Sequence, residues 1–240
     1  AEAAEAKRRA LEEKKRKALL AKARAQGHAT TCSRDVPPEL LEGIARVEAR
    51  HRRVRSIVFT TSGGFVLLDD RGDVEAYEIP AKLTAALQQA RARREPVRLV
   101  SVRWPDDAWV LAHERTLVSD GLEFDIQRLE PAGANPVRIL ALYERGVFAV
   151  RGASELVVDS APISLNNTAE FMRRLQAKER LDWFVPANRH FIAAFGDSLV
   201  WDELPPDLVE AIHAVQARNG VVEVVALTPN AGWVLISREL

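Results

Sequence analysis

The sequence predicts an α+β protein made of about five tandem units of about 42 residues, each a helix followed by a β-hairpin or three-stranded sheet. The segment from Val36 to Arg50 returns, residue class for residue class, from Leu204 to Arg218. Pro37 and Pro205 therefore lie 168 positions apart, which is four periods of 42. An aromatic residue followed by aliphatic residues recurs at steps of 44, 39, 43 and 42 positions, at Phe65, Trp109, Phe148, Phe191 and Trp233. Such a period is typical of repeat arrays, so we expect the units to form a ring or a propeller-like arc.

Composition agrees with a folded chain and excludes several classes of protein. With 240 residues and 47% hydrophobic content, the chain can bury a substantial core. The single cysteine, Cys32, excludes an internal disulfide and a cysteine-based zinc site, and it is interpreted as a small, half-buried residue rather than a reactive thiol. No apolar run reaches the length of about 18 to 20 residues that a membrane span needs, so we expect no span and a soluble chain.

Residues 1–27 form a separate region that predicts one long, charged helix before the units. Residues 1–26 contain nine Lys or Arg residues and four Glu residues in an alanine-rich background, and Gly27 is a plausible helix end. The apolar stripe is too narrow to predict a coiled coil, so the helix is either solvated or contacts an acidic partner. Aromatic residues are absent here, which ranks nucleic acid below protein as that partner. The candidate partner-binding residues of this helix are Arg8, Arg9, Lys14, Lys15, Arg16 and Lys17.

Residues 28–240 form the repeat domain, whose units span approximately 29–72, 73–116, 117–160, 161–197 and 198–240. The last unit is the clearest. Pro205 and Pro206 mark a helix start, and apolar residues follow at helical spacing as far as Val215. A β-branched strand over 221–227, a turn over 229–232 and a strand over 233–236 predict a hairpin.

The other units follow the same order, with one exception. Helices are expected after Pro37, after Pro80 and near Thr168, each followed by two short strands. Residues 116–136 show no helical stripe and predict only a strand around 124–126, so the third unit is interpreted as degenerate.

A third strand is expected to follow each hairpin, as at 74–79, 156–158 and 199–204, but the chain ends directly after the second strand of the last unit. Residues 29–36 precede Pro37 as those third strands precede later prolines. We therefore expect the N-terminal segment to add the missing strand to the C-terminal hairpin and to close a ring. The alternative is an open arc with an extended entry segment.

The stretch from Thr228 to Ile236, with Trp201 shortly before Leu204 and Pro205, resembles a Gly-Trp-Val-type repeat of about 42 residues found in secreted bacterial proteins. It is similar to the non-catalytic N-terminal repeat region of fungal polyglycine hydrolases. The resemblance extends over residues 29–240, with Phe in place of Trp in three units. It implies a repeat domain used for binding or display, and it transfers no catalytic residue.

Catalytic and cofactor motifs are absent from the sequence. There is no Ser-x-x-Lys, no Gly-x-Ser-x-Gly and no phosphate- or dinucleotide-binding glycine pattern. The five histidines do not fall at metal-ligand spacing, and the carboxylates of Asp69, Asp70 and Asp73 are interpreted as turn formers rather than a cation site. We therefore predict no enzyme activity, no cofactor and no metal.

The aromatic residues divide into two groups. Those at the recurring strand position are expected to form the packing layer of the units. Trp104, Trp183 and Trp201 fall outside that position, and they are candidate partner-binding residues.

The sequence favours a non-enzymatic binding or structural scaffold that interacts with a protein or self-associates. Because the chain begins at Ala1 without an initiator methionine, a removed signal peptide or a cut fragment is expected, which favours a secreted, periplasmic or envelope location over the cytoplasm. An accessory substrate-recognition module of a secreted hydrolase is the alternative. Nucleic-acid binding through the basic helix is a weaker one.

Overall fold

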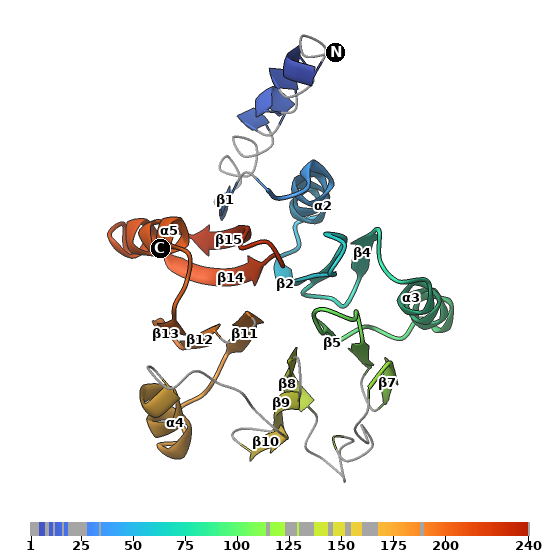
Figure 1. The fold of residues 1–240 in the computed structure, drawn as a ribbon, viewed down its shortest axis with the longest axis vertical. Helices are drawn as coiled ribbons and strands as arrows, with labels where there is room; N and C mark the ends of the chain where they lie inside the picture. Colours follow the sequence, from blue (N-terminus) through green and yellow to red (C-terminus); the bar gives the residue numbers. More distant parts are fainter. Residues whose placement is uncertain are drawn as a thin grey trace.

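The computed structural model of this chain is an α+β structure of small, separate antiparallel sheets and helices (Figure 1). The structure describes residues 5–7, 10–11, 13–15, 17–18, 28–33, 35–113, 116–122, 129, 137–143, 146–151, 155–159, 168–187 and 190–239. Within these ranges the strands form five sheets of three strands each. The α+β class expected from the sequence is confirmed.

Each sheet places the second strand of a hairpin in the middle and a third strand on its far side. The strands, in the order of their pairing, are β2 (Val54–Phe59), β3 (Phe65–Asp69) and β4 (Val74–Tyr77); β5 (Leu99–Val102), β6 (Trp109–Ala112) and β7 (Leu117–Asp120); β8 (Val137–Tyr143), β9 (Gly146–Arg151) and β10 (Glu155–Asp159); β11 (Trp183–Ala187), β12 (His190–Phe195) and β13 (Ser198–Asp202); and β14 (Val221–Leu227), β15 (Trp233–Arg238) and β1 (His28–Cys32). We call the first strand of each set the inner strand.

Four sheets are preceded by a helix: α2 (Pro38–Ala49), α3 (Ala81–Arg93), α4 (Thr168–Gln176) and α5 (Pro206–Gln216). The start of α2 and α5 follows from proline chemistry, because a fixed φ and a missing N–H suit the first helical turn. Leu40 in α2 and Leu208 in α5 occupy equivalent places in the repeated segment and are completely buried. Among residues 116–122 and 129, which precede β8, no α-helix occurs.

The last sheet contains strands from both ends of the chain. β1 pairs antiparallel with β15, with Thr30 opposite Ile236. Two further bonds anchor β1. The backbone N–H of Trp233 donates to Ser33 Oγ at 2.9 Å, and Ser237 Oγ donates to the carbonyl of Ala29 at 3.3 Å. The predicted pairing of residues near 29–36 with the C-terminal hairpin is therefore confirmed for residues 28–33.

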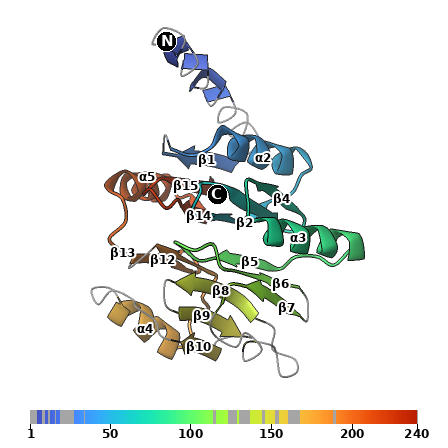
Figure 2. The same ribbon diagram turned by 45° about the vertical axis from the view of Figure 1, so that its right-hand side comes forward.

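Every inner strand contacts the inner strands of two other sheets. β14 contacts β2, β2 contacts β5, β5 contacts β8, β8 contacts β11, and β11 contacts β14. Figures 1 and 2 show the helices on the outer side of the sheets. The inner strands therefore lie next to one another although they come from distant parts of the sequence.

Apolar side chains fill the spaces between neighbouring sheets. One cluster joins Leu40 and Ile44 of α2 to Phe65 of β3 and Ile236 of β15. The five recurring aromatic residues all lie in middle strands and are at most 4% exposed, which confirms that they are packing residues: Phe65, Trp109, Phe148, Phe191 and Trp233.

Residues 117–120 correct the expectation for the segment 116–136. They form β7, which pairs with β6 as a third strand, at a position where no strand was located from the sequence. Four residues are too few to show a clear alternation, and Val118 points outward with 42% of its surface exposed. The strand predicted around 124–126 lies outside the described residues.

The helical residues described between 5 and 18 extend away from the sheets beyond α2 (Figure 2). Lys15 forms an ion pair with Glu42 of α2, and Lys17 pairs with Glu13. In the part of the chain that the structure describes, no helix is long and apolar enough to cross a membrane.

Candidate ligand-binding cavity

The inner strands β2, β8 and β14 share a backbone irregularity near their starts. In each, the pairing register skips one residue, and the skipped residues are Arg55, Arg138 and Glu223. A β-bulge of this kind leaves one residue unpaired and re-aims its side chain. All three side chains belong to the wall of one cavity.

The strands β5 and β11 begin with the same pattern. The backbone N–H of Arg98 donates to the carbonyl of Ala112 at 2.8 Å, and Ala112 is already the partner of Leu99. In the same way, the backbone N–H of Asp182 donates to the carbonyl of Ala194 at 2.8 Å, and Ala194 is already the partner of Trp183. Two residues therefore face one in all five sheets. The resulting set, which we call the charged bulge residues, is Arg55, Arg98, Arg138, Asp182 and Glu223.

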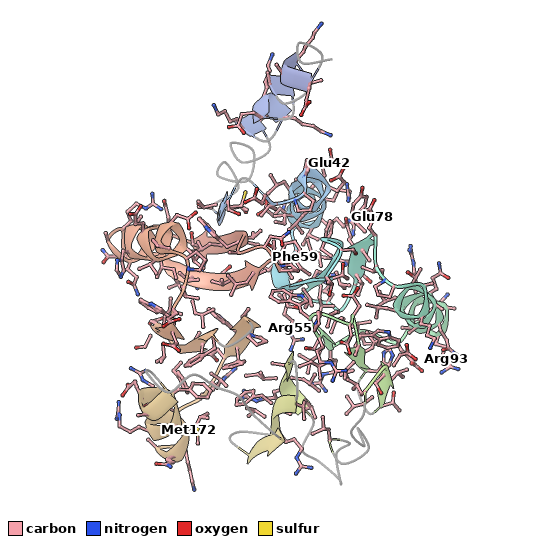
Figure 3. The ribbon with its side chains drawn as sticks, viewed as in Figure 1. Glu42, Arg55, Phe59, Glu78, Arg93 and Met172 are labelled. Atoms are coloured by element: carbon pink, nitrogen blue, oxygen red, sulfur yellow. The ribbon has the colours of Figure 1, made fainter. Side chains whose placement is uncertain are left out.

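The cavity lies among the five inner strands and has a volume of about 570 Å³. Figure 3 shows Arg55 at the centre of the molecule, where the inner strands face one another. Further along, each inner strand contributes apolar side chains to the wall, such as Val58, Val100, Leu140, Phe184 and Val225. The cavity is thus charged where the strands begin and apolar beyond.

Side chains tie the inner strands together near their ends. Trp104 Nε1 donates to the carbonyl of Phe59 at 3.0 Å, so the loop after β5 is bonded to the end of β2. The buried N–H of Leu142 in β8 donates to Ser101 Oγ of β5 at 3.0 Å. These bonds satisfy backbone groups that a sheet edge would otherwise leave unpaired.

The two acidic bulge residues have cationic partners close in sequence or within their own sheet. Glu223 Oε1 forms an ion pair with Arg238 Nε at 3.1 Å. Asp182 pairs with Arg180 at 3.1 Å and also accepts the N–H of Gly196 at 2.8 Å. Their charges are largely balanced without help from the cavity.

The three basic bulge residues differ in their partners. Arg138 Nη2 donates to the carbonyl of Leu181 at 3.1 Å. Among the described residues, the side chains of Arg55 and Arg98 have no hydrogen bond and no ion pair. Burial by the surrounding protein and the nearby charge of Arg98 lower the pKa of Arg55, although part of its side chain reaches solvent. Arg55 lines the cavity, and Arg98 directly precedes Leu99, which also lines it, on the neighbouring inner strand. Neither arginine has an ion-pair partner among the described residues.

Other charged groups also reach this wall. Arg53, Asp70 and Asp197 line the cavity, and the N–H of Asp70 donates to the carbonyl of Arg53. No ion pair joins these carboxylates to Arg55 or Arg98 in the described ranges. The same ranges contain no cluster of side chains suited to hold a metal ion.

The structure separates the candidate residues predicted from the sequence. Trp104 and Trp183 line the cavity. Trp201 is half-buried outside it, with its ring centroid 6.1 Å from that of His213. Lys14, Lys15 and Lys17 lie in the N-terminal helical segment, away from the cavity, and Arg8, Arg9 and Arg16 lie outside the described residues.

The carboxylates of the 69–73 loop have the structural role that the sequence suggested. Asp69 is buried, and its carboxylate accepts the N–H groups of Arg71 and Asp73, both at 2.9 Å. Arg52 forms ion pairs with Asp69 and Asp73. The cluster therefore stabilises the β3–β4 turn.

The charged bulge residues were not predicted, although the sequence carries a signal for them. Each directly follows a Val or Leu at or just before the beginning of an inner strand. They recur at steps of 43, 40, 44 and 41 positions, which is the same period as the aromatic residues.

No protein-family model matches the sequence, and no curated protein matches it. The resemblance to Gly-Trp-Val-type repeats therefore stays a prediction.

Proposed function

We propose that the chain is a non-catalytic binding module, in which five equivalent units form a propeller-like ring around a central ligand-binding cavity. The contacts of each inner strand with two others and the pairing of β1 with β15 support the ring. The observation that carries the proposal is a cavity of about 570 Å³ to which all five inner strands contribute.

The cavity has the character of a binding site for a small ligand. Its volume lies in the range of about 300 to 1,000 Å³ that is typical of such sites, and its apolar wall carries a few polar groups. Each inner strand is also an edge strand, so one row of its backbone N–H and C=O groups lies on the side away from its hairpin partner. These groups offer hydrogen bonds that can orient a ligand.

A fluorescent probe with an apolar ring system, anilinonaphthalene sulfonate, tests the cavity. Val58→Trp fills space beside β2, and Val118→Trp places the same side chain on the exposed outer strand β7. We expect the first variant to weaken probe binding about tenfold, whereas the second leaves it unchanged. Equal binding to both folded variants would contradict a central binding site.

Self-association through the N-terminal helix is a second candidate function. It is favoured by the extension of this segment beyond α2 and by Leu11, whose side chain is 68% exposed. Light scattering after size exclusion would show oligomers that disappear when residues 1–26 are deleted. A monomer unaffected by the deletion would instead fit the accessory-module alternative, and affinity for nucleic acid that falls steeply with salt would favour the third candidate. A secreted or envelope location remains part of the proposal.

A further inference from the structure

We propose that Arg55 and Arg98 form a receptor for one anionic group, so that the ligand of the central cavity is a small amphipathic anion with its head at the charged bulge residues. This inference rests on the proposed function, because it specifies the chemical class of the ligand in the same cavity. It is carried by the position and the partners of the five charged bulge residues.

The order of charges around the inner strands is uneven. The three basic bulge residues lie in β2, directly before β5 and in β8, whereas the acidic ones lie directly before β11 and in β14. One side of the cavity start is therefore basic, and the other side is acidic.

The partners make this asymmetry larger. Asp182 and Glu223 are bound by Arg180 and Arg238 at 3.1 Å each. Arg55 and Arg98 have no such partner among the described residues, and they repel each other. Among the charged bulge residues, the unbalanced charge is therefore positive. An anion placed between the two guanidinium groups removes their repulsion and accepts charge-assisted hydrogen bonds.

The rest of the cavity determines what the anion is attached to. Beyond the arginines the wall is apolar, with Val58, Val100 and Val225 from three different strands. A second charge in that part would lose its hydration without gaining a partner. A single carboxylate or phosphate on an apolar body fits both parts of the cavity, and the planar guanidinium group suits either head group.

Three probes with the same ten-carbon chain separate the contributions of head and body. Decanoate, decyl phosphate and decanol are titrated by calorimetry below their micelle-forming concentrations. We expect decanoate or decyl phosphate to bind at least tenfold more tightly than decanol, and the stronger of the two identifies the preferred head group.

Matched arginine variants then locate the binding of the head group. The double variant Arg55→Gln/Arg98→Gln removes both unpaired charges, and Arg218→Gln removes an exposed arginine that lies after α5 and outside the cavity wall. We expect the double variant to lower anion affinity tenfold or more and to leave decanol binding unchanged, because a charge-assisted pair is lost. Arg218→Gln should have no effect on either.

The possible failures are distinguishable. Equal binding of decanoate, decyl phosphate and decanol, unaffected by the double variant, would overturn the anion receptor but keep the cavity as a binding site. An equal loss of anion affinity in Arg218→Gln would also overturn the receptor, because it would indicate a general charge effect. If neither these probes nor anilinonaphthalene sulfonate bound the folded protein, the proposed function itself would be wrong.

Discussion

The sheets β2–β3–β4 and β14–β15–β1 have the same order of strands but different chain connections. In the first, β3 ends at Asp69 and β4 begins at Val74, so a short turn supplies the third strand. In the second, the third strand comes from the opposite end of the chain, and Ser33 contacts Trp233 across 200 positions of sequence. The comparison shows that one pattern of pairing can serve either to complete a contiguous sheet or to join the two ends of the chain.

The two connections differ in how they are stabilised. The short β3–β4 turn is held by Asp69, whose carboxylate binds two backbone N–H groups and Arg52. We call β1 the closing strand, because it joins the N-terminal segment to the C-terminal hairpin, and it has no turn to hold it in register. It depends instead on its ladder with β15 and on the bonds of Ser33 and Ser237. Because ordering a distant segment costs more chain entropy, the pairing of β1 with β15 is expected to be lost more easily than that of β3 with β4.

The largest effect is expected from removing the closing strand. Deletion of residues 1–34 leaves the edge of β15 bare, whereas deletion of residues 1–26 keeps β1 intact. We expect the longer deletion to cost about 4 kcal/mol or more of unfolding free energy, or about 10 °C in melting temperature, and to promote aggregation through the exposed edge. Thermal unfolding followed by circular dichroism measures the difference.

The shorter deletion is the control for this experiment. It removes the exposed ion pair between Lys15 and Glu42, whose contribution to stability is small. Equal melting temperatures of the two truncated proteins would show that β1 does not stabilise the array, and the comparison between the two sheets would lose its meaning.

Core truncations in equivalent helices give the next largest effect. Leu40 and Leu208 are both completely buried, and each belongs to a cluster that also contains residues of the closing sheet. Leu40→Ala and Leu208→Ala should each cost about 2 to 5 kcal/mol, because each leaves a cavity in a packed core. Denaturant unfolding of both variants compares the two sites directly. If the losses of unfolding free energy in the two variants differed by more than about 3 kcal/mol, the width of the range expected for such substitutions, the two units would not be energetically equivalent.

Much of the fold could be predicted from the sequence because its signals repeat. The proline at the helix start, the β-branched strand and the buried aromatic recur with a period near 42, so each unit supports the interpretation of the others. The pairing of β1 followed from counting strands, since the last unit lacked a third one. β7 was missed because a strand of four residues with an exposed Val118 has too little pattern of its own.

The candidate site was harder to predict. A charged residue after Val54 or Val137 resembles any solvent-facing strand position, and only the bulge turns Arg55 and Arg138 toward a shared cavity. A bulge is a property of backbone pairing, which the sequence does not display. The period of the charged residues was visible, but their common location required the arrangement of all five inner strands.

The buried carboxyl of Glu48 makes the stability of the α2 region depend on pH. Glu48 is 8% exposed, its Oε2 has no hydrogen-bond partner among the described residues, and burial raises its pKa to about 7. The neutral form is therefore favoured by folding. The contribution of neutral Glu48 to the free energy of unfolding is complete below the unfolded-state pKa near 4.5. This contribution is lost as the pH rises through about 7.

Replacement of this carboxyl tests whether α2 responds to pH. We expect Glu48→Gln to be more stable than the parent protein by up to about 3 kcal/mol at pH 8 to 9, because a shift of this size corresponds to that free energy. The advantage should shrink toward pH 5. Unfolding free energies measured across this range would give parallel curves for the two proteins if Glu48 titrated normally in the folded state.

The smallest expected effect concerns the bond between Ser33 and Trp233. Ser33→Ala removes the oxygen that accepts the N–H of Trp233 at 2.9 Å, and a lost bond of this kind costs about 1 kcal/mol. Ser198→Ala is the matched control, because Ser198 is an exposed serine at the start of β13, a third strand that a short turn joins to β12, and its side chain has no hydrogen bond among the described residues. Chemical denaturation should place the control within about 0.5 kcal/mol of the parent protein. If the two serine variants lost the same stability, the side-chain bonds of β1 would add nothing to its ladder, and backbone pairing alone would hold the two chain ends together.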